Sequence, residues 1–402
     1  MNHSHFPRLR RRQIIRSLLA TTALSVSSRL WTGCTSVPSA GSDTDQAKDN
    51  PNAQDITLGF IYAGAIDDYG WNQAHHEGKE GVAKVAKVKT VEQASVPESN
   101  AVQAVMQKMI TEDHVKALFL TAFGYFDPHL LAIAEQNPTV QFFHAGALYD
   151  STKHPRNVGS YFAYTDEVLY LSGMVAAQTS RTGKLGFIAA KPVASVLRNI
   201  NSYTLGARSV RPNITTQVVF TGSWSLPTQE AAAANQLVDQ GIDVLTCHVD
   251  SPTVVIQTAE QRGVFCTGYH TNQASLAPKG YLTGAEWNWA KLYSDYAQLL
   301  QQGKNLMDGS ISHLVRGGFK NEYVKLSDYG SAVSDATRQS VEAAKGKLLS
   351  GDLVIYQGEI RDNTGKVVIP AGQTYRTKSS ELEAMNWLVD GAIGNVNATL
   401  SQ

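Results

Sequence analysis

Cysteine is scarce in this chain. Only three cysteines occur among 402 residues, at positions 34, 247 and 266. So few cysteines cannot hold a fold together by a network of disulfides, and no two of them form the C-x-x-C pair of a redox or zinc site. Cys247 and Cys266 each lie in an apolar, strand-like run, so we expect two buried thiols. A disulfide between them is the alternative.

The common sequence signatures of catalysis are also absent. The chain has no G-x-x-x-x-G-K-[ST] phosphate loop, no G-x-G-x-x-G, no G-x-S-x-G and no H-E-x-x-H. His75 and His76 are adjacent on an expected helix, where neighbouring side chains point about 100° apart, which disfavours a shared metal ion. We therefore expect no enzyme, no cofactor and no metal.

Charge is neither abundant nor one-sided. Charged residues make up 17% of the chain, and 35 basic residues balance 35 acidic ones. Positions 1–33 hold six arginines and no acid, so the rest of the chain has 29 basic and 35 acidic side chains, a net charge of −6. No basic stripe for nucleic acid results from this balance. The 43% of hydrophobic residues suffices for packed cores, and the length suits two lobes.

The first 34 residues indicate an export signal. Arg11 and Arg12 resemble the twin-arginine export motif, and the apolar run Ile14–Leu24 is too short to span a bilayer. Cys34 follows a run that resembles a lipoprotein cleavage site, with its leucine one position early. We expect an exported protein, periplasmic or at the cell surface, anchored to the membrane by lipid on Cys34. An ordinary cleaved signal is the alternative. Residues 35–54 are small and polar, as in a flexible tether.

From residue 55 onward, apolar strand patterns alternate with helical ones. A first series has strands at 55–63, 115–121 and 139–145, separated by helical patterns such as 71–87. A second series of the same kind runs from 167 to 268. Strands joined by helices of this length form parallel sheets, so we predict an α/β fold of two similar lobes. We expect helices at 287–302 and 380–388, and a hairpin turning at 362–365.

Aromatic and polar residues follow the ends of five expected strands. In open α/β sheets, ligands bind at the carboxyl ends of the strands. Two tryptophans, one from each lobe, can enclose a planar ring, and polar side chains can then bind its edge. Capping of the next helix is the alternative role for Asp68. The candidate ligand-binding residues are Asp68, Trp71, Asn72, Phe123, Gly124, Tyr125, Trp224, His248, Asp250 and Asn272.

Several sequence runs resemble the basic-membrane-protein family of solute-binding lipoproteins. The family serves ABC importers, and its characterised branches include purine-nucleoside receptors and an adenine-binding branch. The opening runs Gly59–Tyr62 and Asp67–Gln73 and the glycine-aromatic turn Ala122–Asp127 are similar to family motifs. Arg198–Asn201 and His248–Ser251 resemble the adenine-binding branch.

The resemblance implies a type I periplasmic binding protein fold, with two Rossmann-like lobes joined by three crossovers and a ligand between them. It places the crossovers near Ala163, Thr283 and Phe319. The first lobe is then 55–163 plus 283–319, and the second lobe is 164–282 plus 320–402.

The resemblance also implies ligand contacts. Trp71 and Trp224 occupy the positions that stack the base, and Asp68 and Asn72 occupy positions that contact it. The acids and the lysine that hold ribose in the nucleoside branch are not preserved at 270–272 and near Trp287. We therefore expect a free base, adenine or a related heterocycle.

The expected function is to bind a purine-like base outside the cytoplasm, as a monomer, and to deliver it to the permease of an ABC importer. A receptor subunit that senses the same solute is one alternative. A secreted nucleoside hydrolase that uses Asp67 and Asp68 with calcium is another, but the sequence lacks further acids to complete a cation site.

Overall fold

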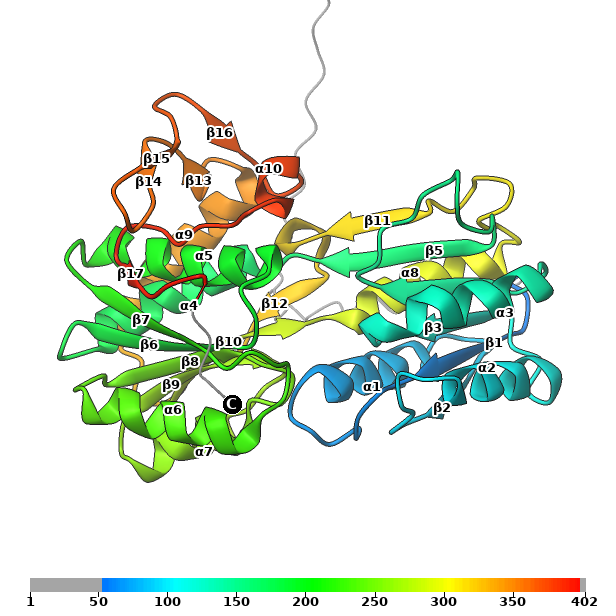
Figure 1. The fold of residues 1–402 in the computed structure, drawn as a ribbon, viewed down its shortest axis with the longest axis horizontal. Coiled ribbons are helices and arrows are strands. Elements are labelled where there is room, and N and C mark those ends of the chain that lie inside the picture. The colour runs from blue at the N-terminus through cyan, green and yellow to red at the C-terminus, as the bar shows by residue number, and fades with distance from the viewer. Residues whose placement is uncertain (1–52, 398–402) are drawn as a thin grey trace, which may run out of the picture. The chain divides into compact units, whose positions relative to one another are not determined.

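The structure is a computed structural model that describes residues 53–397. The chain forms two large sheets with helices packed on them, shown in Figure 1. We call each sheet, together with its helices, a lobe. The expected export signal, Cys34 and nearly all of the expected tether lie outside the described residues.

The sheet of the first lobe has six parallel strands in the order β11-β5-β4-β3-β1-β2. Helices α1 and α8 pack against each other on this lobe. The strands are β1 (Ile56–Ile61), β2 (Val88–Gln93), β3 (Ala117–Leu120), β4 (Gln141–Ala145), β5 (Val158–Ala163) and β11 (Leu314–Gly317); the helices are α1 (Trp71–Val82), α2 (Ala101–Thr111), α3 (Leu131–Gln136) and α8 (Trp289–Gln301).

The sheet of the second lobe has seven strands in the order β12-β10-β9-β8-β6-β7-β17, of which only β12 is antiparallel to its neighbour. The strands are β6 (Lys184–Ala189), β7 (Thr215–Phe220), β8 (Val244–His248), β9 (Phe265–His270), β10 (Tyr281–Trp287), β12 (Val324–Leu326) and β17 (Ala392–Ile393); the helices are α4 (Asp166–Thr179), α5 (Ala194–Val210), α6 (Pro227–Asp239), α7 (Thr253–Gln261) and α9 (Asp335–Ser350).

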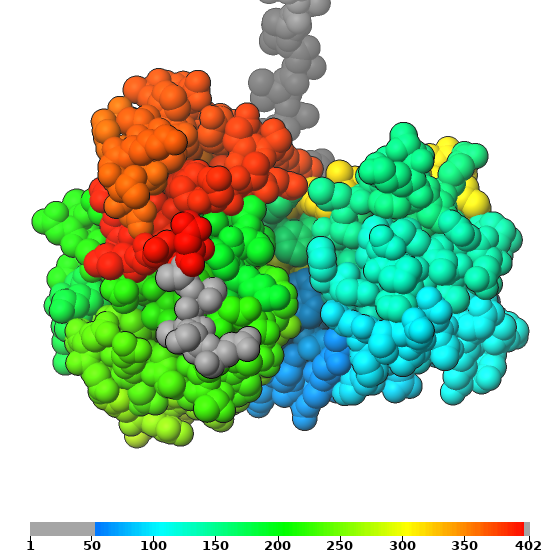
Figure 2. All heavy atoms as spheres, viewed as in Figure 1, coloured from blue at the N-terminus to red at the C-terminus, as the bar shows by residue number. Residues whose placement is uncertain are grey.

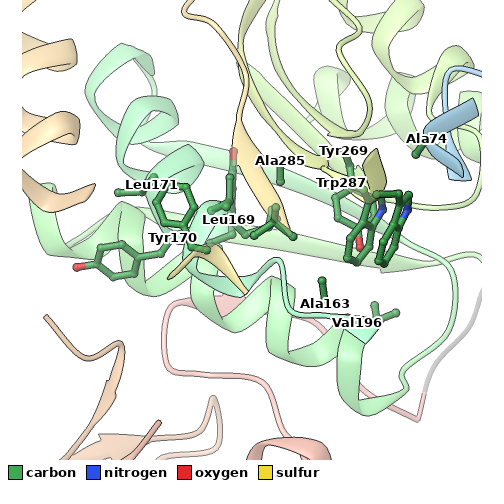
Figure 3. Packing of buried hydrophobic residues seen from close by; sticks show 14 of the residues in the cluster. Ala74, Ala163, Leu169, Tyr170, Leu171, Val196, Tyr269, Ala285 and Trp287 are labelled. Carbon is green, nitrogen blue, oxygen red and sulfur yellow. The ribbon is translucent and has the colours of Figure 1, made fainter. Parts of the chain in front are cut away.

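The central strands are apolar on both faces because helices cover both sides of each sheet. Every residue of β3 and β8 is buried. Helix α4 is likewise buried along nearly its whole length, including Leu169 and Leu171, and it packs on α5 and β10 (Figure 3). Each lobe therefore has a rigid frame that fixes where its strand ends lie.

The chain passes between the lobes three times, as the type I periplasmic binding fold requires. The passages lead from β5 into α4, from β10 into α8 and from β11 to β12. The second passage follows Trp287. Thr283, near which we expected it, lies inside β10 of the second lobe. The expected helix at 287–302 begins at Trp289, because Trp287 still pairs with Val324 in the sheet.

The last described part of the chain, residues 351–397, we call the C-terminal segment. It packs on the second lobe and is orange to red in Figures 1 and 2. The hairpin predicted at 362–365 is present, between β14 (Ile360–Arg361) and β15 (Val367–Ile369). The segment also pairs β13 (Tyr356–Gln357) with β16 (Thr374–Tyr375). Its helix α10 covers only Ser380–Glu383, which is shorter than expected.

Two further sequence expectations can be compared with the structure. Cys247 and Cys266 are both buried and free, so the expectation of buried thiols is confirmed and the disulfide alternative is wrong. Within residues 53–397, no helix is long and apolar enough to cross a membrane.

Candidate functional site

The two lobes touch at the loop between β1 and α1. In Figure 2 this blue part of the first lobe abuts the green second lobe. Four hydrogen bonds join the lobes here. Trp71 N–H donates to Asp250 O (2.9 Å), and Gln273 Nε2 donates to Tyr69 O (2.7 Å). Asp68 O accepts from Ser251 Oγ (2.8 Å) and from Thr253 Oγ1 (3.2 Å). The lobes are therefore closed on each other at this edge of their sheets.

Asp68 and Asn72 shape this loop. The Asp68 carboxylate accepts the backbone N–H groups of Gly70 (2.8 Å), Asn72 (3.2 Å) and Gln73 (2.9 Å), and also the Asn72 amide (2.8 Å). Asn72 Oδ1 accepts the backbone N–H of Gly64 (3.1 Å). Asp68 thus has the capping role that the sequence left open, since it binds the free N–H groups at the start of α1. We leave both residues out of the ligand set proposed below.

Trp71 stands beside a column of stacked rings. The rings of His75, Trp289, Trp287 and His270 follow one another, with centroids 4.8 Å apart for the first two pairs and 6.3 Å for the last. Trp71 lies at 70–85° to all four rings, at centroid distances of 4.3–6.0 Å. Its indole N–H donates to a backbone carbonyl at 3.0 Å. These contacts fix the orientation of Trp71, whose ring stays only partly buried.

His270 ends this column as a neutral ring. Its Nδ1 accepts the indole N–H of Trp287 (2.8 Å), and an indole can only donate, so the ring proton lies on Nε2 and points at the carbonyl of Val249 (2.8 Å). Burial lowers the pKa of His270 to about 3. Its backbone has a φ of +80°, which is uncommon for a residue other than glycine. His270 and Trp287 thus form a neutral, fully bonded wall.

Thr165, Asn199, His248 and Tyr269 form a cycle of hydrogen-bonded side chains, which we call the polar ring, beside a small pocket next to this wall. Asn199 Nδ2 donates to His248 Nδ1 (3.0 Å) and to the Tyr269 hydroxyl (3.2 Å), while Thr165 Oγ1 donates to Asn199 Oδ1 (3.1 Å). Because His248 Nδ1 accepts, its proton is on Nε2, 3.3 Å from the Tyr269 oxygen. Burial lowers the pKa of His248 well below its usual value. The pocket, completed by Phe162, Tyr164 and Trp287, therefore offers neutral hydrogen-bonding groups.

Trp224 belongs to the same region but does not stack on Trp71. Among the described residues, no ring contact joins the two tryptophans directly. They are connected through His270 and His248, with successive centroid distances of 5.9, 6.2 and 6.2 Å. Trp224 is partly exposed, and the Lys191 ammonium lies 5.9 Å from its ring. The structure thus brings both rings to one region from opposite lobes.

Asp250 is an acid at the point where the lobes meet. Its backbone carbonyl accepts the N–H of Trp71 from the first lobe, and its backbone N–H donates to the carbonyl of Trp224 in its own lobe. Burial raises the pKa of Asp250 to about 7, and the carboxylates of Asp68, Glu98 and Glu230 add to the effect. A partly buried carboxyl with such a pKa is typical of a functional site. It can accept a hydrogen bond from a ligand when charged and donate one when protonated.

The remaining sequence candidates lie differently. Tyr125 is buried, and its hydroxyl donates to the carbonyl of Val96 (2.5 Å), so it belongs to the first lobe's core. Phe123 and Gly124 belong to the same short turn, and the Phe123 side chain is 76% exposed. Asn272 is exposed and accepts a backbone N–H within its own turn. The structure does not bring these four residues into contact with the polar ring.

Five residues of this region were not among the sequence candidates: Gly70, Thr165, Asn199, Tyr269 and Trp287. Tyr269 could have been found, because it ends a predicted strand beside His270. Asn199 lies inside α5, and Thr165 lies in the first crossover. Hydrophobic periodicity does not mark a ligand-binding residue at either position. Gly70 is required because the backbone of Asp250, in the second lobe, packs closely against it. A single sequence does not show this contact between the lobes.

The fold and the site together define a class. Two parallel-sheet lobes, three crossovers and a polar–aromatic pocket at the hinge make this chain a solute-binding protein of the type I periplasmic fold. A solved ABC transporter solute-binding protein from Conexibacter woesei supports the fold, with a TM-score of 0.61 at 19% identity over 74% of this chain and 97% of that one.

The chain belongs to the Bmp family, described as PnrA-like ABC transporter substrate-binding proteins, whose model matches residues 56–359. A purine-binding protein of Brucella abortus (strain 2308) is 32% identical over 339 residues, 84% of this chain and 92% of that protein. A putative ABC transporter glucose-binding protein of Haloferax volcanii is 28% identical over 343 residues, 85% of this chain and 81% of that protein.

Membership carries general consequences. A substrate-binding protein of an ABC system works outside the cytoplasm, takes a small-molecule ligand and has permease subunits as partners. The members of this family are substrate-binding proteins, and they are not enzymes.

Proposed function

We propose that this chain binds a free purine base, adenine or a close relative, between its lobes and delivers it to an ABC permease. The observation that carries the proposal is the neutral hydrogen-bonding ring of Asn199, His248 and Tyr269, with Trp71 and Trp224 nearby. A flat heterocycle with donors and acceptors on its edge fits this site. The tryptophan rings can stack on its face, and the polar side chains can form hydrogen bonds with its edge. The purine-binding relative from Brucella supports the same class of ligand.

A free base suits the site better than a nucleoside. Ribose hydroxyls are usually bound by charged or unpaired polar groups, but His270 and Trp287 bind each other, and no titratable side chain of this wall is charged. The wall offers a sugar no free acceptor or donor. Lipid anchoring at Cys34 and action as a monomer remain part of the proposal.

The ligand can be tested by thermal shift. We expect adenine, hypoxanthine or guanine to raise the melting temperature of the purified chain, because a ligand that binds only the native state stabilises it. Adenosine should give a much smaller shift. Glucose belongs in the panel because of the Haloferax relative. If glucose shifts the melting temperature and no purine does, the proposed ligand is wrong.

Replacement of Trp71 by alanine should weaken adenine binding. A base stacked on an aromatic ring contributes about 1–3 kcal/mol, so the Kd should rise about 5- to 100-fold. Isothermal titration calorimetry measures the change. Tyr149→Ala is the matched control, since Tyr149 also loses a ring partner, His313 at 4.1 Å, on the first lobe. Equal affinities of the Trp71 variant and the wild type would remove Trp71 from the site.

The carboxyl of Asp250 should make stability depend on pH. Its folded pKa of about 7 lies above the ordinary value of 3.8, so the folded chain holds a proton that the unfolded chain releases. Its contribution to stability is therefore lost as the pH rises from about 4 to 7. Asp250→Asn should be more stable than wild type at pH 8 by on the order of 2–4 kcal/mol, and this advantage should disappear near pH 4.

Urea unfolding of both proteins at pH 4, 6 and 8 measures this difference. The comparison with wild type cancels other titrating groups, such as Glu167, whose pKa burial raises to about 7. A stability difference that stays constant across the three pH values would contradict the assignment.

A further inference from the structure

The C-terminal segment holds the helix that carries part of the ligand site. Buried or partly buried hydrogen bonds join it to α5. The Tyr356 hydroxyl donates to Arg198 O (2.8 Å), and the Ser202 and Tyr356 hydroxyls bond to each other (2.9 Å). Asn201 Nδ2 donates to Trp387 O (2.9 Å), and Val389 N–H donates to Asn201 Oδ1 (2.8 Å). Most of the segment lies beyond residue 359, where the match to the family model ends.

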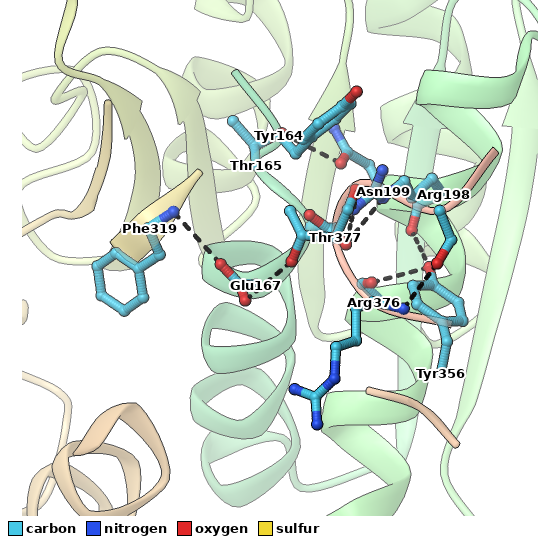
Figure 4. Close-up of polar contacts among 12 residues, drawn as sticks. Tyr164, Thr165, Glu167, Arg198, Asn199, Phe319, Tyr356, Arg376 and Thr377 are labelled. Carbon is cyan, nitrogen blue, oxygen red and sulfur yellow. Dashed lines mark hydrogen bonds and ion pairs between the residues drawn. The ribbon is translucent and has the colours of Figure 1, made fainter. Parts of the chain in front are cut away.

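The same segment also binds the hinge. Arg198 Nη2 donates to the carbonyl of Thr377 (2.9 Å), and the Thr377 hydroxyl donates to Glu167 (3.3 Å), as Figure 4 shows. The Tyr164 hydroxyl donates to the carboxylate of Glu383. Glu167 in turn accepts the backbone N–H of Phe319 (3.3 Å), which lies in the third crossover. One stretch of the segment therefore binds the first crossover directly and is linked to the third crossover through Glu167.

These contacts lie next to the polar ring in sequence and in space. Thr165 lies between Tyr164 and Asp166 in the first crossover, and Asn199 follows Arg198 on α5. Thr165 and Asn199 bond to each other (3.1 Å), and Asn199 orients His248. A displacement of Tyr164 or Arg198 is thus transmitted to the ring through one peptide unit.

We propose that Thr377 and Glu383 are positioning residues of the ligand site. They touch no ligand. Their side chains bind Glu167 and Tyr164 and so fix the first crossover. Thr165 of that crossover in turn binds Asn199 and holds it where the closed lobes need it. This inference rests on the proposed purine binding in the affinity test below, whereas the hydrogen-exchange test needs no ligand.

The test uses the full chain with Thr377→Val and Glu383→Ala, singly and together. Lys378→Ala, an exposed neighbour in the same turn, is the control. We expect the Kd for adenine to rise about 3- to 10-fold in the double variant, with the ligand-free melting temperature within about 2 °C of wild type. Thr377→Ser, which keeps the hydroxyl, should restore the affinity lost in Thr377→Val.

Hydrogen exchange of the ligand-free proteins forms the second test. The amides of residues 164–167 should exchange faster in the double variant than in wild type, while those of the first lobe's β3 stay unchanged. Unchanged exchange overturns the inference. Faster exchange with unchanged adenine affinity also overturns it, because the contacts then stabilise the fold alone. A wild-type chain that binds no purine contradicts the proposed ligand instead, since the exchange experiment contains no ligand.

Discussion

Gly70→Ala is expected to abolish tight ligand binding and to leave both lobes folded. A Cβ atom at Gly70 would lie 1.8 Å from the backbone oxygen of Asp250 and 3.1 Å from Cδ of Pro252. Both of these neighbours belong to the second lobe, whereas Gly70 belongs to the first. The clash therefore acts between the lobes and forces them apart, and the interior of neither lobe is disturbed.

The loss of closure has a large effect on affinity. A ligand held by groups of both lobes binds tightly only to the closed form, so an apparent Kd rises as the closed population falls. The four hydrogen bonds between residues 68–71 and the second lobe would be stretched together. We expect the Kd for adenine to rise on the order of 100-fold or more.

Two measurements check this prediction. Calorimetry gives the Kd, and small-angle X-ray scattering shows whether adenine still makes the chain more compact. Gly346→Ala is the control, because no atom lies within 4 Å of a Cβ at that position of α9 and alanine favours a helix. If Gly70→Ala binds adenine as wild type does, the contact between residues 70 and 250 is not part of the ligand-bound state.

The sequence predicts which strand ends face the ligand region more reliably than it predicts how side chains point. Parallel strands place their carboxyl ends on one edge, which is why Trp71, Trp224, His248 and Asp250 lie in one connected region. Tyr125 follows a strand too, yet its hydroxyl bonds to a carbonyl of its own lobe. Side-chain direction in a turn depends on packing, and packing has no periodic signal.

The roles of polar side chains are a second feature that the sequence alone does not predict. A carboxylate near a helix start can cap that helix or bind a ligand, and both roles use the same oxygen lone pairs. Asp68 meets four donors in its own loop, a fact that only coordinates reveal. Trp287 shows why the boundary of an element is hard to predict, because an aromatic residue at the end of a strand fits the start of a helix equally well by pattern.

Arg198→Ala should cost more stability than any other single change to the hinge considered above. The guanidinium is 3% exposed, lies 2.7–2.8 Å from the carboxylate of Asp166 and stacks on the ring of Tyr164 at 4.3 Å. Removing the arginine leaves a buried carboxylate at Asp166 without its counter-ion. Breaking a buried pair in this way costs about 3–5 kcal/mol, because the remaining charge has lost both water and partner.

The same reasoning predicts a rescue. Asp166→Asn in the Arg198→Ala background removes the unpaired charge, so the double variant should recover part of the lost stability. Arg208→Ala on the same helix is the control: its pair with Asp390 is more exposed, at 3.3 Å, and exposed pairs contribute only about 0–1 kcal/mol. Urea unfolding at pH 7 measures all four proteins. A loss below about 1 kcal/mol for Arg198→Ala would show that this pair does not hold the hinge. A loss without rescue would assign its role to packing on Tyr164, and the first crossover would then depend on the aromatic contact instead of the charge.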